Sequence, residues 1–166
     1  MNYTLIELSY LAGFLDGEGY FCISNICTRK IQNYQQKNLR IGATNTNKDV
    51  LDWIKFTFGG SVSYRGKPRS KKHKKSYVWF ICNQKAEDLS RELLPYLKVK
   101  RLQAEVGLKF RETFHRKDSI VLERDGRPRK IINSYIPQHI IDVREIFRLQ
   151  MNKLNRRGPN DNEAMS

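Results

Sequence analysis

The sequence has few cysteines, and they do not fall in the patterns of a disulfide framework or a zinc site. The three that are present, Cys22, Cys27 and Cys82, form no CxxC pair. An odd number of scattered cysteines argues against both kinds of site, so we interpret them as small core or strand residues. The three histidines show no ligand spacing, which argues against a histidine-based metal site as well.

Long hydrophobic runs are also missing. No apolar stretch approaches the roughly 18 residues that span a bilayer, and the first ten residues lack a basic region followed by an apolar one. We therefore expect a soluble, intracellular protein of the cytoplasm, nucleoid or an organelle, with no membrane partner.

Acidic residues are scarce relative to basic ones. The chain has 31 Lys and Arg against 17 Asp and Glu, which gives a net charge of +14 and a pI near 9.9. Such a surface attracts polyanions, so nucleic acid is the leading partner. With 39% hydrophobic and 11% aromatic residues, the composition describes a globular domain with basic faces rather than a disordered polycation. A ribosomal-type basic protein and a membrane-surface protein are the alternatives at this stage.

The length of 166 residues suits one domain, which we expect over 1–156, followed by a disordered polar tail over 157–166. Hydrophobic periodicity predicts helices near 5–17, 49–58, 86–97, 99–114 and 137–154, and strands near 20–24, 39–45, 61–65 and 77–83. Thr4 and Glu7 can form a capping box at the first helix. Between 115 and 133 the pattern lapses into turns, one of them at Asp125-Gly126.

This order predicts an α+β fold with an αββαββα core and additional C-terminal helices. The two strand pairs are local hairpins of one antiparallel sheet, with the helices on one face and the other face free. In the second strand, Leu39, Ile41 and Ala43 face inward, and Arg40 and Thr44 face outward.

The segment Leu11 to Gly19, LAGFLDGEG, places three glycines and an alanine at the end of an apolar helix, beside two carboxylates. Small residues allow a second helix to pack closely. A plain glycine cap followed by two solvated acids is the simpler interpretation of the last four residues. The whole nine-residue string, however, closely resembles the motif of the LAGLIDADG homing endonucleases of the single-motif, homodimeric type.

The resemblance implies that the motif helix packs against its copy in a second subunit, at the base of a DNA-binding saddle. The interface residues would be Leu11, Ala12, Gly13, Leu15 and Asp16. The two Glu18 carboxylates would hold divalent metal ions, Mg²⁺ or Mn²⁺, with help from the Gly17 carbonyl. Such ions can activate the attacking water and stabilise the leaving oxygen in phosphodiester hydrolysis.

Two further positions match the family by placement. Asn47 falls where relatives carry a polar residue that orients water, and Lys100 falls where they carry a lysine near the scissile phosphate. Lys98 is the alternative candidate for the lysine position. Asn47 and Lys100 could each instead be an ordinary exposed polar residue. Leu51 stands where some relatives have an arginine, so the outer solvent network differs.

A basic run is the second signal, because seven Lys or Arg residues and no acid lie between Arg65 and Lys75. Such a run can be a solvated loop, but at the tip of a hairpin it can also track phosphates, and two-stranded ribbons fit the major groove. The candidate DNA-binding residues are Ser24, Gln32, Gln35, Gln36, Arg40, Thr44, Ser63, Arg65, Lys67, Arg69, Lys71, Lys72, Tyr77 and Trp79.

The sequence thus predicts a site-specific, intron- or intein-encoded endonuclease that cuts a long, near-palindromic double-stranded DNA as a homodimer. The alternative is a non-cleaving RNA maturase or DNA-binding regulator on the same scaffold. A generic basic RNA-binding protein would explain the charge but not the motif.

Overall fold

The computed structural model describes residues 3–25, 37–66, 74–114, 121–124, 127–130 and 136–156. For 121–124 and 127–130 it describes the backbone alone. Its elements follow in the order α1 (Leu5–Glu18), β1 (Gly19–Asn25), β2 (Lys37–Asn45), α2 (Lys48–Phe58), β3 (Ser61–Tyr64), β4 (Tyr77–Cys82), α3 (Asn83–Leu93), α4 (Arg101–Glu112), β5 (Val121–Arg124), β6 (Arg127–Lys130) and α5 (Gln138–Leu154). The predicted α+β class and the αββαββα order are confirmed.

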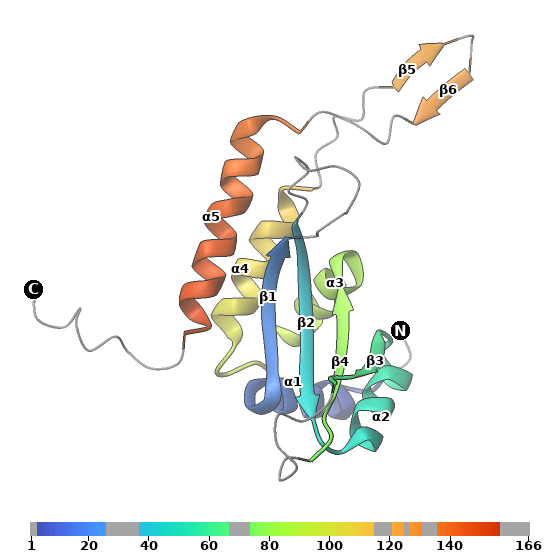
Figure 1. Cartoon of the computed structure of the whole chain (residues 1–166), viewed down its shortest axis with the longest axis vertical. Helices are drawn as coiled ribbons and strands as arrows, with labels where there is room; N and C mark the ends of the chain where they lie inside the picture. Colours follow the sequence, from blue (N-terminus) through green and yellow to red (C-terminus); the bar gives the residue numbers. More distant parts are fainter. Residues whose placement is uncertain are drawn as a thin grey trace, which may run out of the picture.

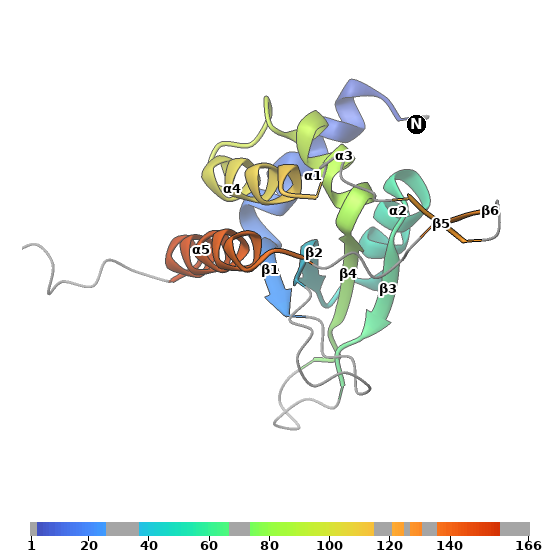
Figure 2. The ribbon, with the colours of Figure 1, turned by 90° about the horizontal axis from the view of Figure 1, so that it is seen from above.

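Strands β1 to β4 form one antiparallel sheet in the order β1-β2-β4-β3. The two local hairpins therefore meet along β2 and β4, where Ala43 pairs with Trp79. Helices cover one face of the sheet and leave the other face open, as Figures 1 and 2 show. We call these the covered face and the open face.

Alternation in β1 and β2 decides which side chains enter the core. Phe21, Leu39, Ile41 and Ala43 are fully buried on the covered face, while Arg40 is partly exposed on the open face. This is the pattern expected of a sheet with one covered face. The predicted orientation of the second strand is confirmed.

The first helix begins as its sequence predicts. Thr4 accepts a hydrogen bond from the backbone N–H of Glu7, and the Glu7 side chain accepts one from the backbone N–H of Thr4. This capping box satisfies two of the free N–H groups at the helix start. The helix ends at Glu18, and β1 follows it without a break.

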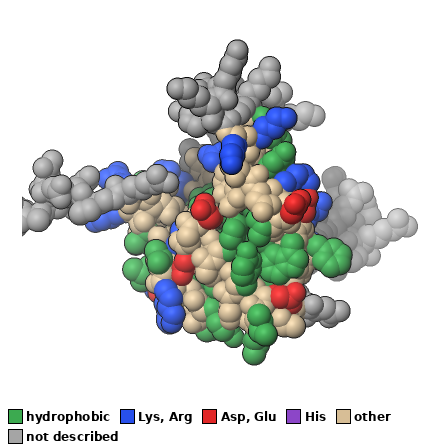
Figure 3. Space-filling view, turned by 90° about the horizontal axis from the view of Figure 1, so that it is seen from below, with side chains coloured by type: hydrophobic (Ala, Val, Ile, Leu, Met, Phe, Trp, Pro, Cys, Tyr) green, Lys and Arg blue, Asp and Glu red, His purple; other side chains and the backbone are tan. Residues whose placement is uncertain are grey.

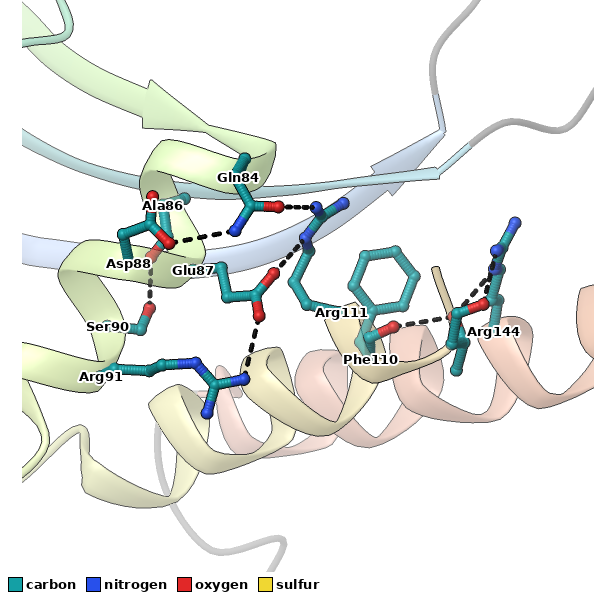
Figure 4. A network of polar contacts seen from close by, with 10 residues as sticks. Gln84, Ala86, Glu87, Asp88, Ser90, Arg91, Phe110, Arg111 and Arg144 are labelled. Atoms are coloured by element: carbon teal, nitrogen blue, oxygen red, sulfur yellow. Dashed lines mark hydrogen bonds and ion pairs between the residues drawn. The ribbon is translucent and has the colours of Figure 1, made fainter. Parts of the chain in front are cut away.

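A polar network joins the helices of the covered face (Figure 4). The buried carboxylate of Glu87 in α3 accepts from Arg111 of α4 at 3.0 Å and from Arg91 at 2.9 Å. Arg144 of α5 donates to the side chain and the carbonyl of Thr113. The Glu87 contacts join α3 to α4, and the Arg144 contacts join α5 to the end of α4. Removing an arginine partner of Glu87 would leave an uncompensated buried charge, so these contacts stabilise the packing of the helices.

The last helix is also fastened to the sheet. The buried ammonium of Lys37 on β2 lies 3.0 Å from the Glu145 carboxylate, and the Asn155 side chain donates to the carbonyl of Phe21 at 2.8 Å. These contacts hold α5 along β1, where Figure 2 shows it beside α4. The described helices include none that is long and apolar enough to cross a membrane.

The segment between α4 and α5 departs from expectation. We predicted only turns there, but β5 and β6 pair as a second antiparallel sheet, with Leu122 opposite Arg129. Pro128 and the many charges hid the strands, because proline and charged residues are poor strand formers. The predicted turn at Asp125-Gly126 and the tail over 157–166 lie outside the described residues.

Candidate active site

The helix that carries the nine-residue motif has two different faces. Its buried stripe consists of Leu8, Leu11, Ala12 and Leu15. The opposite stripe is exposed and contains Ile6, Tyr10, Gly13 and Gly17. A Cβ atom added at either glycine would meet nothing within 4 Å, so this stripe is open to a second helix.

This arrangement corrects part of the predicted subunit interface. Leu11, Ala12 and Leu15 are 0% exposed, because they fill the core of their own subunit, and their assignment to the interface was wrong. Gly13 does lie on the exposed stripe. Asp16, the remaining predicted interface residue, directs its carboxylate toward the start of α4 within the same subunit.

The exposed stripe belongs to an apolar surface. Figure 3 shows hydrophobic side chains gathered on the face of the molecule that is lowest in Figure 1, where α1 lies. Ile6 is 82% exposed and Tyr10 is 51% exposed on α1, and Phe56 of the neighbouring α2 is 91% exposed. Contiguous apolar surface of this kind marks a site of protein association.

Glu18 ends the helix and lies at the edge of a hollow of about 260 Å³. The hollow is lined by Glu18, Thr44, Asn45, Thr46 and Ser76. The glutamate is exposed, and hydroxyl and amide groups surround it. The contribution of Asn45, Thr46 and Ser76 was not predicted, because their position at the ends of β2 and β4 depends on the pairing of those strands.

Lys100 lies beside the two acids of the motif. Its ammonium donates to the backbone carbonyl of Asp16, and it is partly buried, whereas Lys98 is exposed. Burial lowers the pKa of Lys100 below its ordinary value, although the negative charges of Asp16 and Glu18 oppose the shift. Of the two lysines that the sequence offered, Lys100 is therefore the one whose side chain bonds to the end of the motif helix, while the side chain of Lys98 is exposed.

The Asp16 carboxylate accepts hydrogen bonds from three consecutive backbone N–H groups, those of Lys98, Val99 and Lys100. Burial alone would raise the pKa of Asp16, but these hydrogen bonds outweigh it and the pKa is lowered. Asp16 is consequently ionised over the physiological range and links α1 to the start of α4.

Asn47 has a local role in the structure. It is the N-cap of α2, and its side-chain oxygen accepts from the backbone N–H groups of Asp49 at 3.0 Å and Val50 at 3.4 Å. Its own backbone N–H donates to Asn45, which lines the hollow. Asn47 therefore shapes the rim beside Glu18, and its predicted part in orienting water remains a prediction.

Five predicted DNA-binding residues extend along the open face and its edge. Ser24, Arg40, Thr44, Ser63 and Arg65 are exposed or partly exposed there. Arg65, which follows β3, donates to the Thr44 hydroxyl of β2 at 3.4 Å, past the intervening strand β4. Polar and basic side chains of β2 and of the β3 end thus share the open face with apolar residues of β4, and the face borders the hollow at Thr44.

Two predicted DNA-binding residues lie on the covered side of the sheet. Trp79 is 0% exposed on the covered face, where its indole N–H donates to the Gly59 carbonyl at 2.8 Å. Tyr77, two residues earlier on the same strand, packs against the core from the same side. Instead Phe80 and Val78 of β4 face outward. The assignment of the fully buried Trp79 to DNA was wrong, whereas that of the partly exposed Tyr77 remains a prediction.

The remaining predicted contacts belong to the tips of the two hairpins and lie outside the described residues. They are Gln32, Gln35, Gln36, Lys67, Arg69, Lys71 and Lys72.

The described residues include no group of three or more His, Cys, Asp or Glu side chains that could hold a metal ion. In the described part of the chain, the hollow offers the Glu18 carboxylate, neutral side-chain oxygens, and nearby backbone oxygens such as the Gly17 carbonyl. These are hard oxygen donors, which suit Mg²⁺-like ions. The donor set therefore fits a divalent ion in type, but a single subunit supplies only part of it.

Comparison with known proteins gives a consistent result. A family model described as LAGLIDADG endonuclease matches residues 11–112, which is more than half of the chain. No curated protein sequence matches.

Solved structures of homing endonucleases share the fold. The homing endonuclease I-CvuI in complex with its target has 16% identity and a TM-score of 0.66, over 93% of this chain and 85% of that one. The archaeal intron-encoded I-Vdi141I complexed with DNA has 16% identity and a TM-score of 0.66, over 94% and 88%. I-GzeII in complex with its DNA target has 17% identity and a TM-score of 0.61, over 88% of this chain but 45% of that one.

Proposed function

The chain belongs to the LAGLIDADG endonuclease family, whose model matches residues 11–112, and from this premise we propose how it acts. It is a site-specific DNA endonuclease that works as a homodimer, with the Glu18 carboxylates of both subunits at the centre of the site. The substrate is a long, near-palindromic duplex, because a two-fold symmetric protein reads two equivalent half-sites.

One observation carries this proposal. A lone exposed carboxylate, Glu18, ends a helix whose outer stripe of Ile6, Tyr10, Gly13 and Gly17 is uncovered within the subunit. A two-fold axis along that stripe would bring two such helix ends together and double the number of oxygen ligands. The chain spans 85% of I-CvuI but only 45% of I-GzeII, which is the relation expected of one half of a symmetric enzyme.

We propose that the shared site holds divalent metal ions, Mg²⁺ or Mn²⁺, through Glu18 and the Gly17 carbonyl. One relative, I-CvuI, was solved in the presence of calcium and again in the presence of magnesium. The bound ions would supply the positive charge that activates water and offsets the charge of the leaving oxygen. Glu18 suits this role because it is exposed at the hollow and not engaged in the core.

The protein's own side chains contribute binding and orientation. The ammonium of Lys100, fixed at the end of α1, offers a positive charge next to Glu18, where it can stabilise negative charge that develops on a phosphate. The hydroxyls of Thr44, Thr46 and Ser76 around the hollow can hold water in place.

The open face is the proposed DNA surface. Arg40, Thr44, Ser63 and Arg65 lie on it, and the exposed Lys74 near the end of the basic run precedes β4. I-Vdi141I and I-GzeII, which share the fold, were solved with DNA. Long side chains on a twisted sheet can enter the major groove and reach base edges, while lysines contact phosphates.

A non-cleaving maturase or regulator is the second reading, and Glu18 argues against it. A protein that only binds nucleic acid gains nothing from an exposed carboxylate facing phosphates, since like charges repel. The polar hollow at that carboxylate is instead suited to hold water and a cation.

The test is incubation of the purified protein with a library of randomised DNA duplexes and Mg²⁺, followed by sequencing of the new ends. We expect a single recovered target with two related half-sites, cut near its centre, and no cutting in EDTA. Binding without cleavage under every divalent ion tried would contradict the proposal and favour the regulator.

A further inference from the structure

Asp16 makes an unusual set of contacts for a residue in the middle of a helical motif. Its Oδ2 atom accepts from the backbone N–H groups of Lys98 at 2.7 Å and Val99 at 3.1 Å, and its Oδ1 atom accepts from that of Lys100 at 2.9 Å. Both carboxylate oxygens are therefore occupied by one short turn that lies more than eighty residues away in the sequence.

That turn leads directly into α4, which has no capping side chain of its own. Lys100 is the N-cap residue of α4, and its side chain makes no cap hydrogen bond. The free N–H groups and the positive end of the helix dipole favour a negative charge at this point. Asp16 supplies that charge from another helix, so the position of α4 depends on α1.

The link also runs in the other direction. The Lys100 ammonium donates to the backbone carbonyl of Asp16, so residues 16 and 100 hold each other through two separate sets of atoms. The side chain of Lys98 is exposed. The double link fixes which of the two lysines stays at the end of α1.

The geometry of the helix assigns different tasks to the two acids of the motif. Residues two positions apart in an α-helix point about 200° apart. Asp16 accordingly faces the start of α4, while Glu18 faces the hollow beside Thr44. One helical turn thus carries both the proposed reactive carboxylate and the anchor for the neighbouring lysine.

We propose that Asp16 is a positioning residue for cleavage, which holds the turn at Lys98 to Lys100 against α1 so that the Lys100 ammonium stays beside Glu18. The proposal rests on the endonuclease function proposed above. It predicts that loss of the Asp16 carboxylate slows cleavage through Lys100, and not through loss of DNA binding or of the fold.

The first test measures the position of the lysine without any reaction on DNA. The intact protein is treated with an amine-acylating reagent, and the labelling of Lys100 relative to Lys98 is quantified by mass spectrometry. In the parent, Lys98 should react faster than Lys100. In Asp16→Asn, which keeps the size but offers only one acceptor oxygen, the ratio of Lys100 to Lys98 labelling should rise severalfold. Asp16→Ser serves if that variant does not fold.

The matched control is Asn155→Ala. It also removes a contact between a side chain and a distant backbone group, the hydrogen bond to the Phe21 carbonyl, but it leaves the hydrogen bonds of Asp16 in place. Its labelling ratio should equal that of the parent. An unchanged ratio in both Asp16→Asn and Asp16→Ser would overturn the proposal.

The second test is a double-mutant cycle on the duplex recovered from the library. Asp16→Asn should slow single-turnover cleavage about 10- to 100-fold while the DNA dissociation constant stays within about twofold. In a Lys100→Met background the same change should have almost no further effect, because the group that it positions is gone. A purely structural role would slow both backgrounds equally.

The outcomes separate the two proposals. A parent protein that cuts no duplex overturns the proposed function and the role of Asp16 with it. If the parent cuts, the proposed function stands. If, in addition, the double variant loses cleavage rate by the product of the two single-variant losses of Asp16→Asn and Lys100→Met, only the role of Asp16 is overturned.

Discussion

The guanidinium of Arg40 lies 3.7 Å from the centre of the Phe80 ring, in the middle of the open face of the sheet. Arg40 is on β2 and Phe80 on β4, so the contact spans the junction of the two hairpins. Because stacking on the ring restricts the long side chain, Arg40 is presented in one orientation before DNA arrives.

Arg40→Ala should therefore relax the base preference at one position in each half-site, at a cost of about 1–3 kcal/mol in discrimination. Phe80→Leu should weaken the preference at the same position by a smaller amount. The cleavage profile over a library of target variants measures both. Arg91→Ala, which removes an exposed arginine from the helical side, is the control and should leave the profile unchanged. A change at many positions at once would show that Arg40 only contacts phosphates.

Gly13→Leu should separate the subunits without unfolding them. The space around Gly13 is empty within the subunit, so a larger side chain there meets only the partner helix. Overpacking of this kind costs about 1–3 kcal/mol, and the dimer dissociation constant should rise about ten- to a hundredfold. Sedimentation velocity measures the dimer, and thermal unfolding of dilute protein measures the subunit. Lys109→Leu, at an exposed position of α4, should leave the dimer intact, and a Gly13→Leu variant that dimerises like the parent would exclude the α1 interface.

Trp79→Phe should lower stability and leave DNA recognition unchanged. The substitution removes the hydrogen bond to Gly59 and part of a fully buried ring. We expect a loss of about 1–3 kcal/mol in the free energy of unfolding, measured by urea denaturation. The affinity for DNA per folded molecule should not change. A lower affinity for DNA with an unchanged free energy of unfolding would show that Trp79 contributes to the DNA-binding surface after all.

The sequence predicted β1 and β2 correctly but not the orientation of β4, and the composition of the strands explains the difference. In β2, Arg40 and Thr44 alternate with Leu39 and Ile41, so one face is visibly polar. In β4 the residues on both faces are apolar, and alternation gives no preference. Which face of β4 is buried depends on the contacts of Trp79 with Gly59 and Ala43. These residues are distant in the sequence, so the local pattern of β4 does not predict the contacts.

The same ambiguity affected the motif helix. Its residues are apolar on nearly all sides, so the sequence could not separate the stripe that enters the subunit core from the stripe left for a partner. Leu11 and Leu15 were assigned to the partner but belong to the core. The contact of Asp16 with the turn before α4 was equally hidden, because it joins segments more than eighty residues apart.

Acid should loosen the attachment of α5 through Glu145. The hydrogen bond from Arg148 and the neighbouring Lys37 ammonium hold the pKa of the Glu145 carboxyl at about 2, below its ordinary value of 4.5. Because the folded state favours the ionised form, this interaction stabilises the fold above pH 4.5 and is lost as the pH falls from 4.5 toward 2. Urea midpoints of the parent should decline over that window, and those of Glu145→Gln should decline less. Parallel curves for the two proteins would contradict this assignment.

The most direct test of the account concerns Glu18, in cleavage and binding assays on the same duplex with Mg²⁺. Glu18→Gln keeps the size of the side chain and removes the charge that would hold the metal ions. We predict that single-turnover cleavage falls by at least about 100-fold. DNA binding measured without metal should remain or rise slightly, because a negative charge near phosphate is gone. If Glu18→Gln cuts as fast as the parent, this carboxylate is not catalytic and the site has been placed at the wrong residue.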